Sequence, residues 1–202
     1  MIRLETFAAI DFETTGSVQG YPVEPWQIGV VHWSAAGPET WETLLRVGPR
    51  PFHPRAPGRH EALREEIARA SVLQAHLPEL RRYCARVPLV AHNAATEKKC
   101  LRISVPMERF GPYIDTLKLS RAIWPDLRSH ALGDVLNALS LRDQVEELVP
   151  GREAHDALYD AAGSAVLLRH ILALPELADC STEVLFHPDQ AAYYRRRMKF
   201  ER

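Results

Sequence analysis

Short hydrophobic runs follow one another in the first quarter of the chain. Residues 7–12 are apolar except for Asp11 and include aromatic and β-branched side chains, a pattern typical of a strand buried on both faces. Residues 26–34 and 40–47 show similar features, and Gly37 and Pro38 between them predict a turn. We therefore expect the first three strands to form an antiparallel meander.

From residue 60 onward, apolar residues recur at helical spacing. Within residues 60–86 this spacing is interrupted at Ser71 and Pro78, which predicts two short helices rather than one long helix. Residues 96–104 also have helical periodicity, and Thr96 is the expected N-cap of that helix. Strands thus give way to helices in this part of the chain.

A short apolar run at residues 88–91 leads into a helical segment, and residues 113–116 lead into another. The last long helix is expected to begin near Asp156, an acceptable N-cap, and to end near residue 174, before a proline. Small side chains in its first turns would let this helix approach a sheet closely: Ala157, Ala161, Ala162, Gly163 and Ala165. Strands followed by alternating helices and strands predict an α/β domain with a mixed sheet flanked by helices.

Length and composition indicate one domain of a soluble protein. At 202 residues and 46% hydrophobic, the chain is long enough for a single well-buried core. Acidic residues interrupt the apolar start and no later apolar run approaches membrane-spanning length, so we expect a cytoplasmic protein without membrane contact. The three cysteines are widely spaced, which indicates neither a disulfide framework nor a zinc site.

Two acids stand at the end of the first predicted strand. Asp11 and Glu13 are two residues apart and therefore point to the same side, whereas Phe12 points to the other. Two carboxylates held together at the end of a buried strand repel each other unless a proton or a cation offsets the repulsion. The pattern therefore predicts a hard divalent metal with oxygen ligands. The alternative is a strand end at which both acids face water.

A histidine and an acid flank the start of the last helix. If that helix begins at Asp156, His155 lies just outside it and Asp160 lies about one turn inside. A titratable base then stands beside an acid near a helix N-terminus, where negative charge is favoured. One alternative is that His155 and Asp156 are only cap residues. Another is an all-helical metal phosphohydrolase of the HD type, against which the strand-rich first quarter argues.

Taken together in order, these elements resemble one family. Asp-Phe-Glu-Thr-Thr-Gly at 11–16, Val-Ala-His-Asn-Ala at 90–94 and His-x-Ala-x-x-Asp-Ala at 155–161 resemble the motifs of the DEDDh branch of the DnaQ-like 3′-5′ exonucleases. This is the superfamily of the polymerase III proofreading subunit. The resemblance spans residues 7 to about 172.

The resemblance implies a fold and an activity. The fold would be ribonuclease-H-like, with a mixed five-stranded sheet. The activity would be hydrolysis of phosphodiester bonds at the 3′ ends of single-stranded nucleic acid, DNA rather than RNA, with release of nucleoside 5′-monophosphates. Two Mg²⁺ or Mn²⁺ ions would serve as cofactors, and a polymerase or repair protein could be a partner.

The resemblance also assigns roles to residues. Asp11, Glu13 and Asp160 would bind the metal ions, and His155 would be the general base. With the acid of the second motif, they form the expected catalytic set: Asp11, Glu13, Glu97, His155 and Asp160. Contacts with the terminal nucleotide are expected from three further residues: Thr14, Thr15 and His60.

One position departs from the family pattern. The second motif usually reads His-Asn-Ala-x-Phe-Asp, whereas this chain has Thr96 in place of Phe and Glu97 in place of Asp. The adjacent Lys98 and Lys99 could pair with Glu97 or contact phosphate. Three interpretations remain open: a shifted helix that still places Glu97 at the metal, a slower enzyme, or a degenerate domain that only binds nucleic acid or a polymerase.

The chain is expected to divide into an exonuclease domain at residues 1–175 and a basic C-terminal extension at 176–202. Residues 193–202 carry five basic residues and one acid, with aromatic residues between them, and could grip nucleic acid. The alternative that we favour is a solvated helix packed on the domain through its hydrophobic residues: Tyr193, Met198 and Phe200. The whole chain has a net charge of −1, so any polyanion must be held locally.

Overall fold

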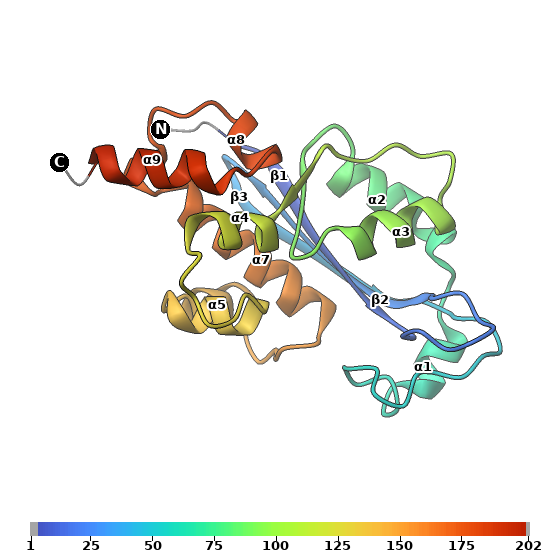
Figure 1. The fold of residues 1–202 in the computed structure, drawn as a ribbon. Coiled ribbons are helices and arrows are strands. Elements are labelled where there is room, and N and C mark those ends of the chain that lie inside the picture. Colours follow the sequence, from blue (N-terminus) through green and yellow to red (C-terminus); the bar gives the residue numbers. More distant parts are fainter. Residues whose placement is uncertain (1–3, 201–202) are drawn as a thin grey trace.

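A five-stranded sheet forms the centre of the molecule in the computed structural model, which describes residues 4–200 (Figure 1). Its strand order is β3-β2-β1-β4-β5. The strands are β1 (Phe7–Thr14), β2 (Pro25–Ser34), β3 (Gly37–Leu44), β4 (Leu89–Ala91) and β5 (Tyr113–Asp115). The first three pair antiparallel, while β4 and β5 add in parallel beside β1. The expected mixed sheet with an antiparallel meander is confirmed, and an all-helical fold is excluded.

The turn between β2 and β3 lies two residues before the predicted position. Ser34 pairs with Gly37, so the connection is the two-residue turn at 35–36, and Pro38 already belongs to β3. Gly37 has a φ of 108°, a conformation that residues with a side chain rarely adopt. Pro38 is tolerated because β3 is an edge strand, where one face of the backbone needs no ladder partner.

Helices cover both faces of the sheet (Figure 1). One face is packed by α2 (Leu77–Cys84) and α3 (Ala95–Ser104), and α1 (Arg64–Arg69) precedes them in the chain. The other face is packed by α7 (Ala157–Leu172), with α4 (Thr116–Ile123), α5 (Leu132–Ala138) and α6 (Arg142–Leu148) against it. The C-terminal region adds α8 (Glu183–Phe186) and α9 (Gln190–Phe200), and two 3₁₀ turns occupy Leu73–His76 and Pro175–Leu177.

Two helix starts differ from expectation. Pro78 lies in the first turn of α2, where a missing N–H costs nothing because no carbonyl precedes it in the helix. Thr96 does not cap α3: the N-cap is Ala94, and it makes no side-chain capping bond. Since Thr96 is already inside the first turn, Glu97 also lies in that turn, near the positive end of the helix.

Alternate residues of β1 enter two separate cores. Phe7 and Ala9 pack with α7 and its neighbouring helices, whereas Ala8, Ile10 and Phe12 pack with α2 and α3. Because side chains alternate along a strand, Asp11 and Glu13 continue the row that faces α7. The first motif therefore points its acids toward the helix that carries the third motif.

Close contact between α7 and the sheet depends on a glycine in β2. A Cβ built on Gly29 would lie 2.3 Å from the backbone of Ala157 and Leu158, so the N-terminus of α7 rests directly on this strand. Gly29 is also the partner of Asp11 across the β1–β2 ladder. Gly163, which we expected to serve the same approach, faces α5 instead: its Cβ would meet Leu136 at 3.0 Å.

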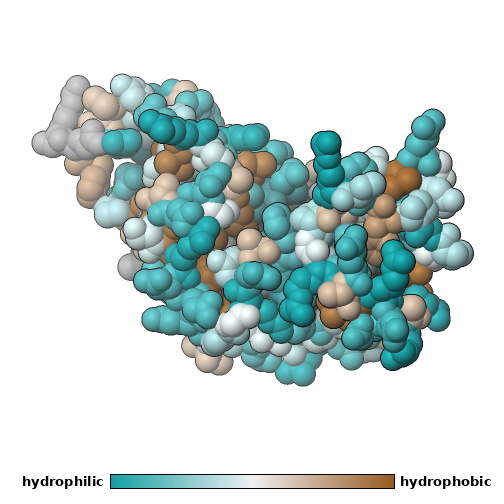
Figure 2. Space-filling view, turned by 90° about the horizontal axis from the view of Figure 1, so that it is seen from below, coloured by the Kyte–Doolittle hydropathy of each residue, from teal (hydrophilic) through white to brown (hydrophobic). Residues whose placement is uncertain are grey.

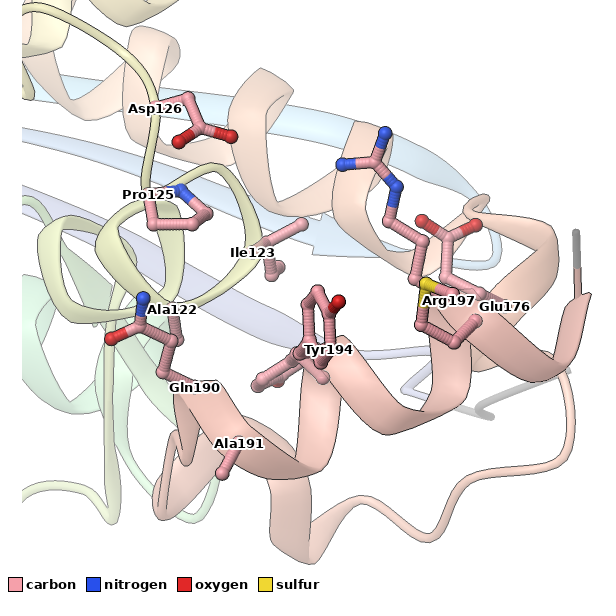
Figure 3. A pocket seen from close by; sticks show the side chains of 11 residues that line it. Ala122, Ile123, Pro125, Asp126, Glu176, Gln190, Ala191, Tyr194 and Arg197 are labelled. Carbon is pink, nitrogen blue, oxygen red and sulfur yellow. The ribbon is translucent and has the colours of Figure 1, made fainter.

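The C-terminal helix α9 packs against α4. Tyr193 is buried and its hydroxyl donates to the carbonyl oxygen of Val184 at 2.9 Å. Met198 and Phe200 are exposed. The prediction that the C-terminal helix packs on the domain through Tyr193, Met198 and Phe200 is therefore wrong for Met198 and Phe200. A pocket of about 670 Å³ opens beside α9, where Tyr194 lies opposite Ile123 (Figure 3), and none of the predicted site residues lines it. Residues 201–202 of the basic tail lie outside the described part.

The surface seen from below is mostly hydrophilic, with hydrophobic residues in small separate groups (Figure 2). Its outline is indented between the part that carries α5 and α9 and the part that carries α1 to α3. Within residues 4–200, every helix is too short or too polar to span a membrane.

Candidate active site

The first motif places two acids at the carboxyl end of β1. Glu13 is buried, with 5% of its surface exposed, and Asp11 is partly buried. Across the ladder, Asp11 pairs with Gly29 and Glu13 with Gln27. Both acids therefore lie over the part of β2 that the start of α7 covers.

The third motif brings a histidine and a further acid to the same place. Asp156 caps α7, as predicted, because its carboxylate accepts hydrogen bonds from the N–H groups of Leu158 and Tyr159. His155 precedes the cap with a φ of 67°, and its backbone N–H donates to Oδ2 of Asp160 at 3.2 Å. This bond closes the turn, so the imidazole and the Asp160 carboxylate lie on the same side of the helix start.

Glu13, His155 and Asp160 converge. One possible ligand atom of each residue lies within 4.8 Å of those of the other two, an arrangement that could hold a metal ion. Asp11 does not belong to this triplet. The sequence predicted Asp11, Glu13 and Asp160 as ligands, and the structure adds His155 to the groups that could bind a metal.

Glu97, from the first turn of α3, completes the cluster from the other face of the sheet. Only 3% of its surface is exposed, and its Oε2 is buried without a hydrogen-bond partner among the described residues. Lys98 and Lys99 are exposed, and Nζ of Lys98 lies 4.6 Å from the centre of the Tyr113 ring. The sequence analysis allowed an ion pair between Glu97 and one of these lysines. The salt bridges within residues 4–200 include no such pair.

Crowding and burial make these acids hard to ionise. Burial, followed by the charges of Glu97, Asp160 and Glu13, raises the pKa of Asp11 well above its usual value. Burial and the charges of Asp160, Asp156 and Glu97 raise the pKa of Glu13 to about 8. Burial is also the main reason why the pKa of Glu97 rises to about 8 and that of Asp160 to about 6. The cluster therefore strongly favours a nearby positive charge.

Divalent cations fit these residues. The cluster offers carboxylate oxygens, which are the ligands that Mg²⁺ and Mn²⁺ prefer. The unpartnered Oε2 of Glu97 and the raised carboxyl pKa values are two features that a bound cation would relieve.

A network behind the cluster holds the His155 turn in place. The Arg152 guanidinium pairs with Glu42 of β3 and with Asp156, at 2.9 Å from Oδ2 of the latter. Gln27 of β2 donates to the same Asp156 oxygen at 3.2 Å and accepts from the N–H of Ala157 at 3.3 Å. These bonds tie the start of α7 to two strands. Three residues of this network belong to no recognisable motif and could not be identified from the sequence: Arg152, Gln27 and Glu42.

The predicted nucleotide-contacting residues lie at the end of β1, in the loop that follows it, and in the turns between β3 and α1. Thr15 is fully buried, and its hydroxyl accepts a hydrogen bond from the N–H of Glu24 at 3.1 Å. Thr14 is partly buried, and its hydroxyl accepts from Gly16 at 3.4 Å. His60 lies in the turns before α1, with its ring centre 4.6 Å from that of Phe52. The side chain of Thr15 thus holds the loop, while Thr14 and His60 are more accessible.

With this geometry in place, comparison with known proteins is informative. The RNase_T family model, described as exonuclease, matches residues 8–168. The chain belongs to this exonuclease family. Exodeoxyribonuclease 10 of Escherichia coli strain K12 is 29% identical to this chain over 163 residues, which are 81% of the chain and 67% of that protein. DNA polymerase III PolC-type of Streptococcus sanguinis strain SK36 is 26% identical over 148 residues, 67% of this chain and 9% of that protein.

Solved structures agree with this assignment. Exonuclease X in complex with 5′-overhanging duplex DNA matches this chain with a TM-score of 0.64 and 29% identity, over 82% of this chain and 90% of that one. Pop2p of S. pombe, in a form with Mg²⁺ and Mn²⁺ bound, has a TM-score of 0.61 at 14% identity, over 90% of this chain and 88% of that one, which supports the fold alone. The predicted family and ribonuclease-H-like fold are confirmed, and the relatives imply a hydrolytic nuclease.

Proposed function

We propose that this chain is a metal-dependent 3′-5′ exonuclease. It hydrolyses the terminal phosphodiester bond at a nucleic-acid 3′ end, in DNA in preference to RNA, and releases nucleoside 5′-monophosphates. The observation that carries the proposal is the convergence of Glu13, His155 and Asp160, with Asp11 and Glu97 raising the negative charge around them. In a member of an exonuclease family, such a cluster suits phosphodiester hydrolysis.

Asp11, Glu13 and Asp160 are the proposed ligands of two Mg²⁺ or Mn²⁺ ions, with Glu97 at the edge of the same cluster. Such ions supply positive charge that offsets the charge building on the phosphate during hydrolysis. The fold itself restricts the positions of these carboxylates. Asp11 and Glu13 are fixed by the ladder to β2, and Asp160 is fixed by its bond from the His155 N–H.

His155 is the proposed general base. Its side chain is exposed while its ligand atoms lie close to Glu13 and Asp160, so it stands between solvent and the acids. An imidazole in that place can accept a proton from the attacking water. Its position depends on the positive φ of the residue and on Arg152, which anchors the turn through Asp156.

The proposed substrate contacts are Thr14, Thr15 and His60. Because the hydroxyl of Thr15 is already bonded to Glu24, its contact would come from the backbone. The names of two relatives support DNA as the substrate: one is an exodeoxyribonuclease, and the other was solved in complex with duplex DNA. We further propose residues 1–175 as the nuclease domain, a single-stranded 3′ end as the reacting end, a cytoplasmic location, and a polymerase or repair protein as partner.

The test is cleavage of 5′-labelled single-stranded DNA and RNA by the purified chain with Mg²⁺, Mn²⁺ or EDTA. A ladder of products shortened from the 3′ end, in metal but not in EDTA, is expected, with DNA degraded faster. An oligonucleotide blocked by a 3′-terminal phosphorothioate tests polarity, because it should be degraded slowly. Chromatography of the released products separates mononucleotides from longer fragments.

Matched variants assign any activity to this site. Asp11→Asn should abolish cleavage, whereas Glu66→Gln, which neutralises an exposed acid on α1, should not change it. If oligonucleotides bind but no metal releases product, the chain is a nucleic-acid-binding module that has lost activity. Such a result would refute the proposed function.

A further inference from the structure

A second pocket lies beside the loop that follows β3. It has a volume of about 510 Å³ and is lined by residues 46–52 on one side and by His60 and the first turns of α1 on the other. Three arginines are part of its lining: Arg46, Arg50 and Arg64. Neither Asp nor Glu lines it among the described residues. In a chain with a net charge of −1, this is a local concentration of positive charge.

Arg50 is buried in a way that leaves its donors unused. Only 2% of its side chain is exposed, and none of its Nε, Nη1 and Nη2 atoms has a hydrogen-bond partner within residues 4–200. Glu24 approaches Nη1 at 3.6 Å, and the ring of Tyr21 lies 5.5 Å from the guanidinium carbon. A guanidinium has five N–H donors, and burying them without acceptors is costly.

Glu24 forms an ion pair with Arg50 through Oε1, but at 3.6 Å that oxygen accepts no hydrogen bond from the guanidinium. Its Oε2 accepts a hydrogen bond from the N–H of Gly48 at 2.9 Å, and its backbone pairs with Thr15. Glu24 therefore holds the loop and places Arg50, while leaving most of the guanidinium without an acceptor.

His60 adds another unused atom to the same lining. Its Nδ1 is buried without a hydrogen-bond partner among the described residues, and its ring packs between Phe52, at 4.6 Å, and Trp26, at 6.2 Å. Burial lowers the pKa of His60, which favours a neutral ring that can still donate one N–H. Two buried groups of one pocket thus have hydrogen-bonding atoms without partners.

We propose that this pocket binds a phosphate group. A phosphate oxygen is an acceptor of the right charge for Arg50, and the planar guanidinium matches phosphate in a two-pronged hydrogen bond. Arg46 and Arg64, at the more exposed rim, add attraction without the cost of burial. An apolar or cationic ligand would leave the Arg50 donors unsatisfied, so the lining favours an anion.

The pocket is separate from the acid cluster but connected to it through one loop. The N–H of His53 donates to the carbonyl oxygen of Thr15 at 2.8 Å, and Thr15 in turn holds Glu24. A Cβ on Gly58 would lie 2.9 Å from the carbonyl oxygen of His155, so the far end of this loop touches the His155 turn. The segment that lines the phosphate pocket is therefore continuous with the loop that reaches the turn carrying His155.

The phosphate could belong to a free phosphate or mononucleotide, or to a nucleic-acid strand at a distance from its reacting end. Only the second source rests on the proposed function. The first experiment uses inorganic phosphate alone, in EDTA. Raising phosphate, with chloride at equal ionic strength as reference, should raise the Tm of the wild type by mass action, and calorimetric titration should give its Kd.

Variants locate the binding. Arg50→Met keeps the aliphatic stem but removes every donor, and should weaken phosphate binding at least tenfold, since charge-assisted bonds are strong. Arg64→Gln should weaken it severalfold without disturbing the interior, which keeps the test decisive if Arg50→Met fails to fold. Arg69→Gln, on the exposed face of α1, removes the same charge outside the pocket and should have no effect. No phosphate-dependent rise in the wild type, or equal losses in Arg64→Gln and Arg69→Gln, overturns the proposal.

A second experiment separates the two sources. Single-stranded oligonucleotides with one neutral methylphosphonate linkage, moved along the strand, are bound in EDTA and followed by fluorescence anisotropy. If a strand phosphate occupies the pocket, one linkage position should lower affinity in the wild type but not in Arg50→Met. If only free phosphate binds, Arg50→Met should not change the effect of any linkage position on oligonucleotide affinity. The affinity for inorganic phosphate should still fall in Arg50→Met. Loss of cleavage alone affects neither readout, so failure of the proposed function would be seen separately.

Discussion

Glu97→Gln tests whether the acid that departs from the family pattern is a buried, proton-holding member of the site. The substitution keeps the size of the side chain and removes its ionisation. In the wild type without metal, the folded state raises the pKa of Glu97 from 4.5 to about 8, mainly by burial. Between these two pKa values the folded protein holds a proton that the unfolded chain has lost. The contribution of Glu97 to the free energy of unfolding is therefore fully present below pH 4.5 and is lost as the pH rises to about 8.

The size of this effect follows from the same two values. One pKa unit corresponds to about 1.4 kcal/mol, so the interval from 4.5 to about 8 corresponds to about 5 kcal/mol at most. Between these pH values the free energy of unfolding should fall by about 1.4 kcal/mol per pH unit on account of Glu97. Glu97→Gln should equal the wild type near pH 4.5 and exceed it increasingly above pH 6. Removing the charge also relieves Asp11, for which Glu97 is the largest neighbouring charge.

The assay is urea unfolding in EDTA at several pH values from 5 to 9, with the free energy of unfolding extrapolated to water. The difference between variant and wild type reports Glu97 together with its effect on Asp11, since the other titrating groups are common to both. Glu66→Gln, at an exposed position on α1, is the control and should run parallel to the wild type. If Glu97→Gln also runs parallel, Glu97 is ionised in the folded protein at little cost, and the argument from burial is wrong.

Four further changes test the site. Asp11→Asn should abolish cleavage and leave the metal-free protein as stable or more so, and Mn²⁺ should raise its Tm much less than that of the wild type. His155→Ala should lower the single-turnover rate by orders of magnitude, and near-normal turnover would exclude His155 as the base. Glu97→Asp should lower activity, because the shorter acid no longer reaches the cluster from α3; a tenfold rise in single-turnover cleavage would show instead that Glu97 fits poorly. Gly29→Ala should destabilise the fold by about 1–3 kcal/mol in urea unfolding and cost about a hundredfold in rate by pushing α7 off β2. Gly133→Ala, in α5, should spare the rate, because its Cβ would meet only the end of the Arg142 side chain at 3.7 Å.

The sequence by itself determined the features that depend on neighbouring residues. The apolar run of β1 specified a buried strand, and strand alternation specified that Asp11 and Glu13 share a face. Asp156 could be identified as the cap of α7 because capping joins groups two or three residues apart. Local chemistry also placed His155 just outside that helix. The three motifs together predicted the family, which the match over residues 8–168 bears out.

Only the tertiary structure decided which distant residues complete the site. Gly29 in β2 lies beneath Ala157, and no local pattern marks it as the glycine that admits the helix. Arg152 meets Glu42 at a separation of 110 residues, and Arg50 is buried by a loop whose conformation no periodicity describes. Whether a polar group is buried and unpartnered depends on every element packed around it. That property of Glu97 and Arg50 arises only when the chain folds and brings those elements together.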